Sequence, residues 1–132
     1  MRSFDALTAA LLQERLAGTC APDDPVDVVM PAGSERWPDF VRERITRTLQ
    51  PAGVLIPVME RVAGLSVLLT QRSAELKHHA GPVSFPGGRM EEHDRDIVHA
   101  ALRETHEEVG IPPEAITVVG YLPPMPTITG YA

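Results

Sequence analysis

The chain has 132 residues, of which 43% are hydrophobic and 23% are charged, and its formal net charge is −6. This length suits one domain with its own core, and this balance excludes a disordered chain. The sequence contains no apolar run long enough to span a bilayer, and its negative charge argues against a nucleic-acid-binding protein. The single cysteine, Cys20, excludes an internal disulfide and fits a reducing compartment, so we expect a cytoplasmic protein.

A helix is expected near the N-terminus, followed by a loop and a second, shorter helix. Ser3 can accept the first free backbone N–H groups, and Gly18 can end the helix in the left-handed conformation. The Pro- and Asp-rich residues 19–35 predict a loop, and the next helix is expected over residues 38–49. The apolar stripe of the first helix consists of Phe4, Leu7, Leu11 and Leu12.

Strands are expected where short apolar runs lie between turn-forming residues. The first two runs are joined through Ala63-Gly64, and the third stops at Pro86-Gly87-Gly88, because proline cannot continue a sheet ladder. The expected strands cover residues 53–60, 65–72, 83–85 and 115–122.

A helix is expected from about Asp94 to Val109, where Gly110 ends it. Glu104, Glu107 and Glu108 lie at i, i+3 and i+4 and share one face of this helix. The face roughly 120° away is expected to pack against a sheet. Its members are Val98, Ala101, Leu102, Thr105 and Val109.

The acidic face of this helix has two interpretations. Charge runs usually face water, which makes it a solvated surface. Alternatively, a divalent cation offsets the repulsion among the three carboxylates, and oxygen-only ligands suit Mg²⁺ or Mn²⁺ better than Zn²⁺. Two features favour the cation: the acids occupy the helix end that the dipole makes unfavourable for them, and a glycine turn precedes the helix. Arg103, one turn before Glu107, can orient a carboxylate.

The segment from Gly88 to Ile111 resembles the Nudix box, whose usual form is G-x5-E-x7-R-E-U-x-E-E-x-G-U, with U an aliphatic residue. The resemblance has departures: Asp94 stands in place of the first Glu, one extra residue separates it from the Arg, and Thr105 fills the first aliphatic place. The matching residues are Arg103, Glu104, Glu107, Glu108, Gly110 and Ile111.

Residues 68–88 are similar to a second signature, which marks the coenzyme A pyrophosphatase branch of Nudix hydrolases. That signature reads L-L-T-x-R-S, then a basic residue, then G, then F-P-G-G, and the same branch commonly has the lengthened box with Asp. Two adjacent signatures make a far more specific match than one glycine motif. The residues in register are Leu68, Leu69, Thr70, Arg72, Ser73, Lys77, Gly81, Phe85, Pro86, Gly87 and Gly88.

The resemblance implies an α/β/α sandwich with a mixed sheet and a hydrolase that uses Mg²⁺ or Mn²⁺. For this branch it implies cleavage of the diphosphate bond of coenzyme A or its derivatives, which gives 3′,5′-ADP and 4′-phosphopantetheine or its acyl form. The expected partner is a small nucleotide substrate, with no nucleic acid and no membrane.

The resemblance also assigns roles to residues of this sequence. Glu104, Glu107 and Glu108, with the carbonyl oxygen of Gly88, would hold the metal ion, and Arg103 would orient one of the glutamates. These four charged residues form the expected catalytic set. The residues expected to contact the substrate are Arg72, Lys77 and Gly87, since Arg and Lys suit phosphate oxygens.

Residues 1–50 are expected to form a helical extension that packs on a Nudix domain over residues 51–132. Members of the branch continue with further strands and a helix, so we expect the C-terminal part of that domain to lie beyond Ala132. An open sheet edge would permit pairing between two copies as a homodimer. Two other functions stay open: hydrolysis of ADP-ribose or a dinucleotide, and a non-catalytic module that binds metal or nucleotide or dimerises.

Overall fold

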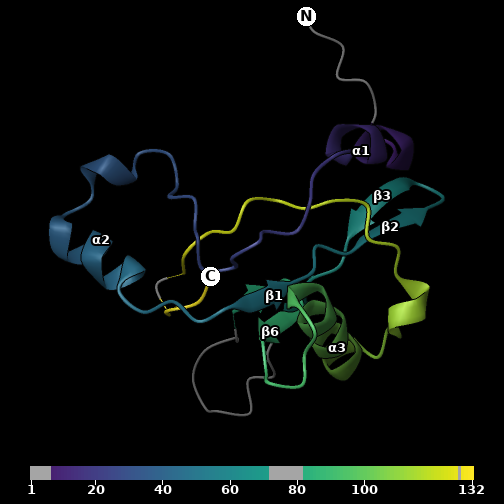
Figure 1. Cartoon of the computed structure of the whole chain (residues 1–132). Coiled ribbons are helices and arrows are strands. Elements are labelled where there is room, and N and C mark those ends of the chain that lie inside the picture. Colours follow the sequence, from purple (N-terminus) through teal and green to yellow (C-terminus); the bar gives the residue numbers. More distant parts are fainter. Residues whose placement is uncertain (1–6, 72–81, 128) are drawn as a thin grey trace, which may run out of the picture.

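The computed structural model describes residues 7–71, 82–127 and 129–132 (Figure 1). These residues contain the helices α1 (Ala9–Leu16), α2 (Asp39–Thr46) and α3 (Ile97–Val109), and the 3₁₀ turns η1 (Ser34–Arg36) and η2 (Pro113–Ala115). The strands are β1 (Ala52–Val54), β2 (Val58–Arg61), β3 (Gly64–Val67), β4 (Thr70–Gln71), β5 (Val83–Ser84) and β6 (Gly87–Arg89). The fold is mixed α/β, and the predicted class is confirmed.

The strands pair in three antiparallel ladders, β1 with β6, β2 with β3, and β4 with β5. Two further backbone bonds extend these ladders: Leu55 N donates to Pro86 O at 2.9 Å beyond β1 and β6, and Leu68 N donates to Pro57 O at 3.0 Å beyond β2 and β3. A parallel bridge links Gln50 to Tyr131 at the other end. The described strands thus form three short two-stranded sheets.

Helix α3 lies directly against β1 and β6 (Figure 1). Gly53 of β1 is buried, and a Cβ there would collide with the carbonyl oxygen of Ile97 and the amide of Ala101. On the helix side, Ala100 and Thr105 are 0% exposed. Small residues on both surfaces allow this close approach, and the predicted burial of Ala101 and Thr105 is confirmed.

Both ends of α3 have clear local causes. Asp96 is the N-cap, with an extended backbone and a carboxylate that accepts a hydrogen bond from His99 N at 2.8 Å. Gly110 adopts φ +72°, the left-handed conformation that ends the helix, as predicted. The predicted start at Asp94 is wrong, because the Asp94 side chain binds Arg103 instead of capping the helix.

The N-terminal helix begins later than predicted. Thr8 caps α1, since its hydroxyl accepts a hydrogen bond from Leu11 N at 3.2 Å, and the helix starts at Ala9. The predicted cap, Ser3, lies outside the described residues. The second helix, α2, ends at Thr46, three residues before the predicted end.

The predicted strand over residues 115–122 is wrong. After η2, residues 116–122 are described and form no regular element. These residues contact a loop and the end of α1 instead of another strand. Tyr121 N donates to the Thr19 hydroxyl at 2.9 Å, and Gly120 lies against Leu16. Apolar β-branched residues favour a strand only where a neighbouring strand can pair with them.

Two other predicted strands are interrupted. The run over residues 53–60 breaks at Leu55–Pro57 and becomes β1 and β2. The run over residues 65–72 divides into β3 and β4, and its last residue lies outside the described part of the chain. Pro57 explains the first break, since its nitrogen has no hydrogen to donate to a ladder.

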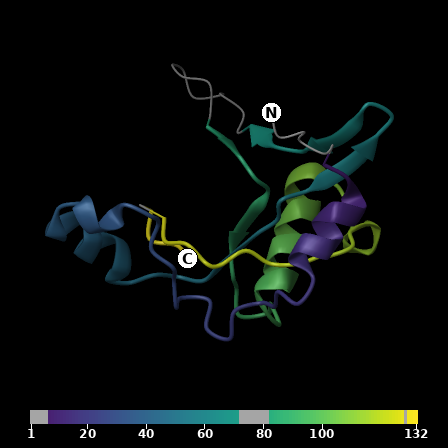
Figure 2. The same cartoon turned by 90° about the horizontal axis from the view of Figure 1, so that it is seen from above.

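The C-terminal segment runs back toward the N-terminal part of the chain (Figure 2). Val29 N donates to Pro124 O at 2.7 Å, and Ala132 N donates to Gln50 O at 3.0 Å. These bonds tie the segment before β1 to the segment after η2. Among the described residues, no helix has the length and apolar character needed to cross a membrane.

Candidate metal and substrate site

Strand β6, which contains Gly87 and Gly88, lies against Glu104, the first glutamate of the acidic helix face. Gly88 is the ladder partner of Gly53, and a Cβ on Gly88 would lie 2.5 Å from the Cδ atom of Glu104. It would also lie 2.8 Å from each oxygen of that carboxylate. The Glu104 carboxylate therefore occupies space that any side chain at residue 88 would fill.

Arg103 binds the neighbouring carboxylates and leaves little of its own surface to solvent. Its Nη1 atom lies 2.8 Å from Glu104 Oε1 and 3.5 Å from Glu107 Oε1. Its Nη2 atom also donates to the carbonyl oxygen of Arg89 at 3.3 Å. The side chain is only 15% exposed. The structure thus brings Arg103 to two of the three predicted metal ligands.

Asp94 anchors the other side of the guanidinium. Its side chain is fully buried and accepts two hydrogen bonds from Arg103, from Nε at 3.0 Å and from Nη2 at 2.8 Å. It also accepts a bond from Glu91 N at 2.9 Å. A two-pronged pair of this kind fixes the plane of the guanidinium as well as its position.

The hydrogen bonds from Arg103 hold the pKa of Asp94 well below its usual range, and the bond from Glu91 N adds to this effect. Burial of the carboxyl acts in the opposite direction and is outweighed. The bonds to Asp94 and Glu104 also raise the pKa of Arg103 above its ordinary value. The pair is therefore ionised throughout the physiological pH range.

This pair predicts a pH dependence of stability. Because the pKa of Asp94 is lower in the folded state, its contribution is complete above the unfolded value of about 3.9. The contribution is lost as the pH falls below that value toward the folded pKa. We expect the difference in urea midpoint between the wild type and Asp94→Asn to shrink below about pH 4. A difference that stays constant from roughly pH 7 to roughly pH 3 would contradict this origin.

The second and third glutamates of the helix face are open to solvent. The Glu107 side chain is 59% exposed, and Glu108 is exposed. In the described part of the chain, no three His, Cys, Asp or Glu side chains already stand together as a metal cluster. Glu104, in contrast, is fixed beside Gly88 by its bond to Arg103.

The donor chemistry still fits a hard divalent cation. Glu104, Glu107 and Glu108 offer carboxylate oxygens, which Mg²⁺ and Mn²⁺ prefer. The glycine at residue 88 leaves its backbone free to approach an ion next to Glu104. These residues fit the predicted metal, and their role as ligands stays a prediction.

A cavity of about 230 Å³ opens beside the same turn. Its lining residues are Thr70, Gln71, Ser84, Gly87 and Glu108. The Thr70 hydroxyl bonds to the carbonyl oxygen of Ser84 at 3.1 Å, which joins β4 to β5 along one wall. The predicted substrate residue Gly87 therefore lies in a hollow next to the acidic helix face. Arg72 and Lys77 lie outside the described residues.

Replacing Gly88 by alanine tests the contact between the turn and Glu104. The new methyl group would displace the Glu104 carboxylate, which Arg103 holds in place. We expect Gly88→Ala to weaken Mn²⁺ binding by about 10-fold or more, since even outer residues of metal sites have effects of this size. Electron paramagnetic resonance titration measures the affinity. Unchanged affinity in a folded variant would place the metal away from Glu104.

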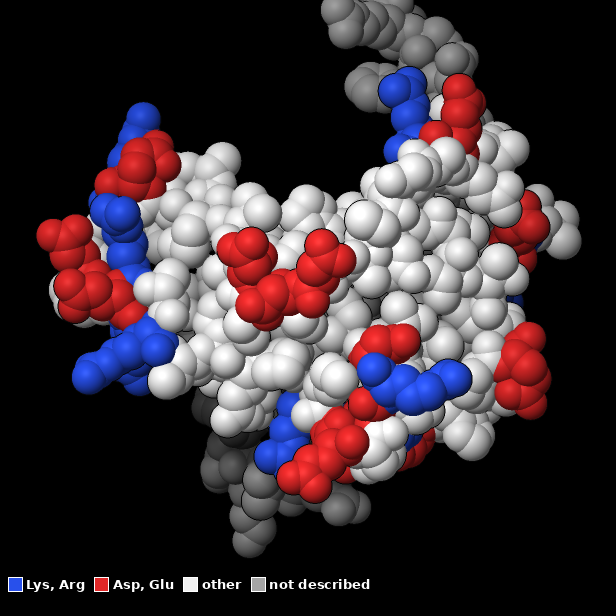
Figure 3. Space-filling view, viewed as in Figure 1, with Lys and Arg blue, Asp and Glu red and all other residues white. Residues whose placement is uncertain are grey.

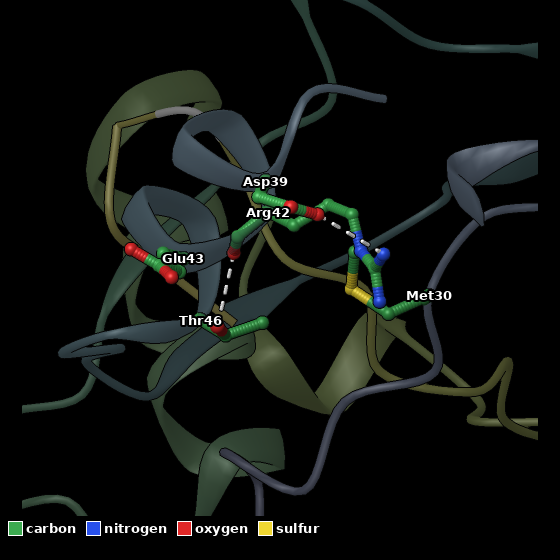
Figure 4. A pocket seen from close by; sticks show the side chains of 5 residues that line it. All are labelled: Met30, Asp39, Arg42, Glu43 and Thr46. Atoms are coloured by element: carbon green, nitrogen blue, oxygen red, sulfur yellow. Dashed lines mark hydrogen bonds and ion pairs between the residues drawn. The ribbon is translucent and has the colours of Figure 1, made fainter. Parts of the chain in front are cut away.

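A larger cavity, of about 290 Å³, lies on α2, far from α3 (Figures 1 and 4). Its charged groups bind one another, because Arg42 Nη1 lies 3.7 Å from Asp39 Oδ1 and both side chains are largely exposed. Figure 3 likewise shows basic and acidic side chains interleaved over α2. An exposed ion pair of this kind contributes little energy, so this cavity gives no indication of a site.

Sequence reasoning missed Asp94 as a member of the site. The signal was present, because Asp94 occupies the place of the first Glu in the box that the sequence resembles. The sequence could not show that this carboxylate is fully buried and forms an ion pair with Arg103 of the acidic helix.

Comparison with known proteins identifies the family to which this fold belongs. The family described as NUDIX domain matches residues 49–131, and the chain belongs to the Nudix family. It is 52% identical over 86 residues to a Citrobacter koseri protein named uncharacterized Nudix hydrolase NudL, which covers 65% of this chain and 44% of that protein. It is 48% identical over 94 residues to a protein of the same name from Escherichia coli O1:K1 / APEC, which covers 71% and 47%. The chain thus spans about half the length of the curated relatives it matches.

Proposed function

We propose that this chain carries the metal-binding helix of a diphosphohydrolase that cleaves coenzyme A or its derivatives. Water would break the bond between the two phosphates and release 3′,5′-ADP and 4′-phosphopantetheine or its acyl form. The observation that carries this proposal is the Glu104 carboxylate held between Arg103 and the bare backbone of Gly88. The resemblance of residues 68–88 to the coenzyme A branch supports the choice of substrate.

The residues of the site have two proposed roles: some would bind the metal ion, and Arg103 and Asp94 would keep a metal-binding glutamate in position. Glu104, Glu107, Glu108 and the carbonyl oxygen of Gly88 would hold Mg²⁺ or Mn²⁺. A bound divalent ion neutralises the diphosphate and makes a coordinated water more acidic. Arg103 stays paired with Asp94 and keeps Glu104 turned toward Gly88.

The cavity beside Gly87 is the proposed entry for the substrate. Its hydroxyl and amide groups, from Thr70, Gln71 and Ser84, can hydrogen-bond to polar atoms of a nucleotide. Arg72, directly after this wall in the sequence, and Lys77 would contact the phosphates. Substrate atoms would thus lie between the polar wall and the carboxylates of α3.

A specific observation keeps the non-catalytic module as a second candidate. The described residues expose several large apolar side chains at their surface. Apolar side chains on neighbouring strands are part of this surface, such as Val58 and its ladder partner Val67. A second copy could cover them as a homodimer. The cytoplasmic location stays a prediction from the single cysteine.

The decisive experiment incubates the purified chain with coenzyme A, ADP-ribose and a dinucleoside polyphosphate, each with Mg²⁺ or Mn²⁺. Release of phosphopantetheine from coenzyme A supports the proposal. Cleavage of ADP-ribose or the dinucleotide alone supports a different Nudix activity. Metal binding without turnover of any substrate supports the non-catalytic module, and light scattering of the same sample reports whether the chain forms a dimer.

A further inference from the structure

The imidazole of His99 lies beside the buried carboxylate that anchors Arg103. His99 occupies the first turn of α3, and its Nδ1 atom lies 3.2 Å from Asp94 Oδ1. Arg103 is one helical turn further along, so both side chains reach Asp94 from the same face of the helix. The His99 side chain is 34% exposed, and the Asp94 side chain is fully buried.

Three of the approximately four acceptor positions of the Asp94 carboxylate have clear donors. Arg103 supplies two of them, and Glu91 N supplies the third. The remaining position, on Oδ1, faces His99 Nδ1. The only other imidazole near this atom among the described residues is that of His93, whose Nε2 is 4.0 Å away and more strongly exposed.

The Nδ1 atom of His99 has two competing neighbours. Arg95 N approaches it at 3.3 Å as a donor, which requires a lone pair on Nδ1. Asp94 Oδ1 approaches it at 3.2 Å as an acceptor, which requires a proton on Nδ1. A lone pair facing a buried carboxylate would be repulsive, whereas an N–H group there makes a charge-assisted bond. The bond to the buried carboxylate is therefore the stronger of the two, at the expense of the contact with Arg95 N.

We propose that His99 is a positioning residue, which carries a proton on Nδ1 and donates it to Asp94, so that Asp94, Arg103 and Glu104 form one fixed chain of contacts. The inference rests on the proposed function, because its consequence is the orientation of a metal-binding glutamate. His99 itself contacts neither metal nor substrate. Its effect reaches Glu104 only through Asp94 and Arg103.

The position of the proton can be measured without any metal. Long-range ¹H–¹⁵N spectra of protein labelled with ¹⁵N-histidine show which nitrogen of a neutral imidazole ring carries the proton. The spectra are recorded at about pH 8, above the usual imidazole pKa of roughly 6.5. The imidazole resonances that are absent from the spectrum of the His99→Leu variant are assigned to His99. We expect the proton on Nδ1. A proton on Nε2, with Nδ1 accepting from Arg95, overturns the proposal.

A matched pair of substitutions tests the consequence for the metal. The side-chain amide of Asn can place its NH₂ group where Nδ1 lies, whereas Leu has a similar shape and no donor. We expect His99→Leu to weaken Mn²⁺ binding by about 10-fold, the lower end of the range for residues that orient metal ligands. His99→Asn should stay close to the wild type. The control His106→Leu, at an exposed position of the same helix, should have no effect.

The two sets of measurements separate the possible failures. Wild-type affinity in His99→Leu overturns the positioning role. Equal losses in His99→Asn and His99→Leu also overturn it, because a donor at residue 99 then makes no difference. If the wild-type chain binds no Mn²⁺, the proposed function fails, and the proton position in the spectra still decides the contact between His99 and Asp94.

Discussion

Glu107→Gln is expected to abolish metal-dependent turnover of coenzyme A while leaving the fold intact. The amide removes the negative charge and one of the oxygens that a hard cation requires. We expect kcat/KM to fall at least about 100-fold, because loss of a ligand should exceed the roughly 10–100-fold effects of residues that orient ligands. The side chain is 59% exposed and lies 3.5 Å from Arg103, so the substitution disturbs little packing.

The control for this experiment is Glu114→Gln, which makes the same chemical change at an exposed position in η2. It should match the wild type in kcat/KM and in urea midpoint. Steady-state release of phosphopantetheine measures the activity, and circular dichroism verifies the fold. Full activity of Glu107→Gln would mean that the metal ligands are misassigned.

The sequence predicted the acidic helix well because its determinants are local. The end at Gly110 follows from one residue type, and the shared face of Glu104, Glu107 and Glu108 follows from helical geometry. The proximity of Arg103 and Glu107 follows from their spacing of four residues. None of these features depends on what the rest of the chain does.

The parts that the sequence mispredicted depend on partners elsewhere in the chain. Residues 115–122 have strong strand propensity, but the described structure offers them the Thr19 side chain and Leu16 instead of a free strand. Propensity for a strand has no effect without a ladder to complete. In the same way, the start of α3 depended on whether Asp94 or Asp96 capped it, and the attraction of Asp94 to Arg103 decided the outcome.

The contact between Gly88 and Glu104 gives a physical reason for a glycine that the family resemblance singles out. The resemblance placed Gly88 among the metal ligands, but it gave no reason for a glycine there. The structure supplies one, because Gly88 pairs with Gly53 under α3 and any side chain would strike the Glu104 carboxylate. Two glycines facing one another across β1 and β6 thus allow the helix and its first glutamate to approach the sheet.

Asp94→Asn is expected to lower both stability and activity, although it changes only one oxygen to an NH₂ group. The carboxylate accepts from Arg103 at both oxygens and from Glu91 at one. An amide in the same place must point its NH₂ group at one of these donors, in a site that is fully buried. The guanidinium would then lose its two-pronged partner and depend on Glu104, Glu107 and the carbonyl oxygen of Arg89.

The expected loss in kcat/KM and in Mn²⁺ affinity is about 10–100-fold, because Glu104 would lose the support that fixes Arg103. The matched control is Asp96→Asn, two residues away, where Asn caps a helix about as well as Asp. Urea unfolding near neutral pH should give a clearly lower midpoint for Asp94→Asn and a wild-type midpoint for Asp96→Asn. If both variants match the wild type in midpoint and activity, Arg103 does not need Asp94, and the support of Glu104 must come from the carbonyl oxygen of Arg89 and from Glu107.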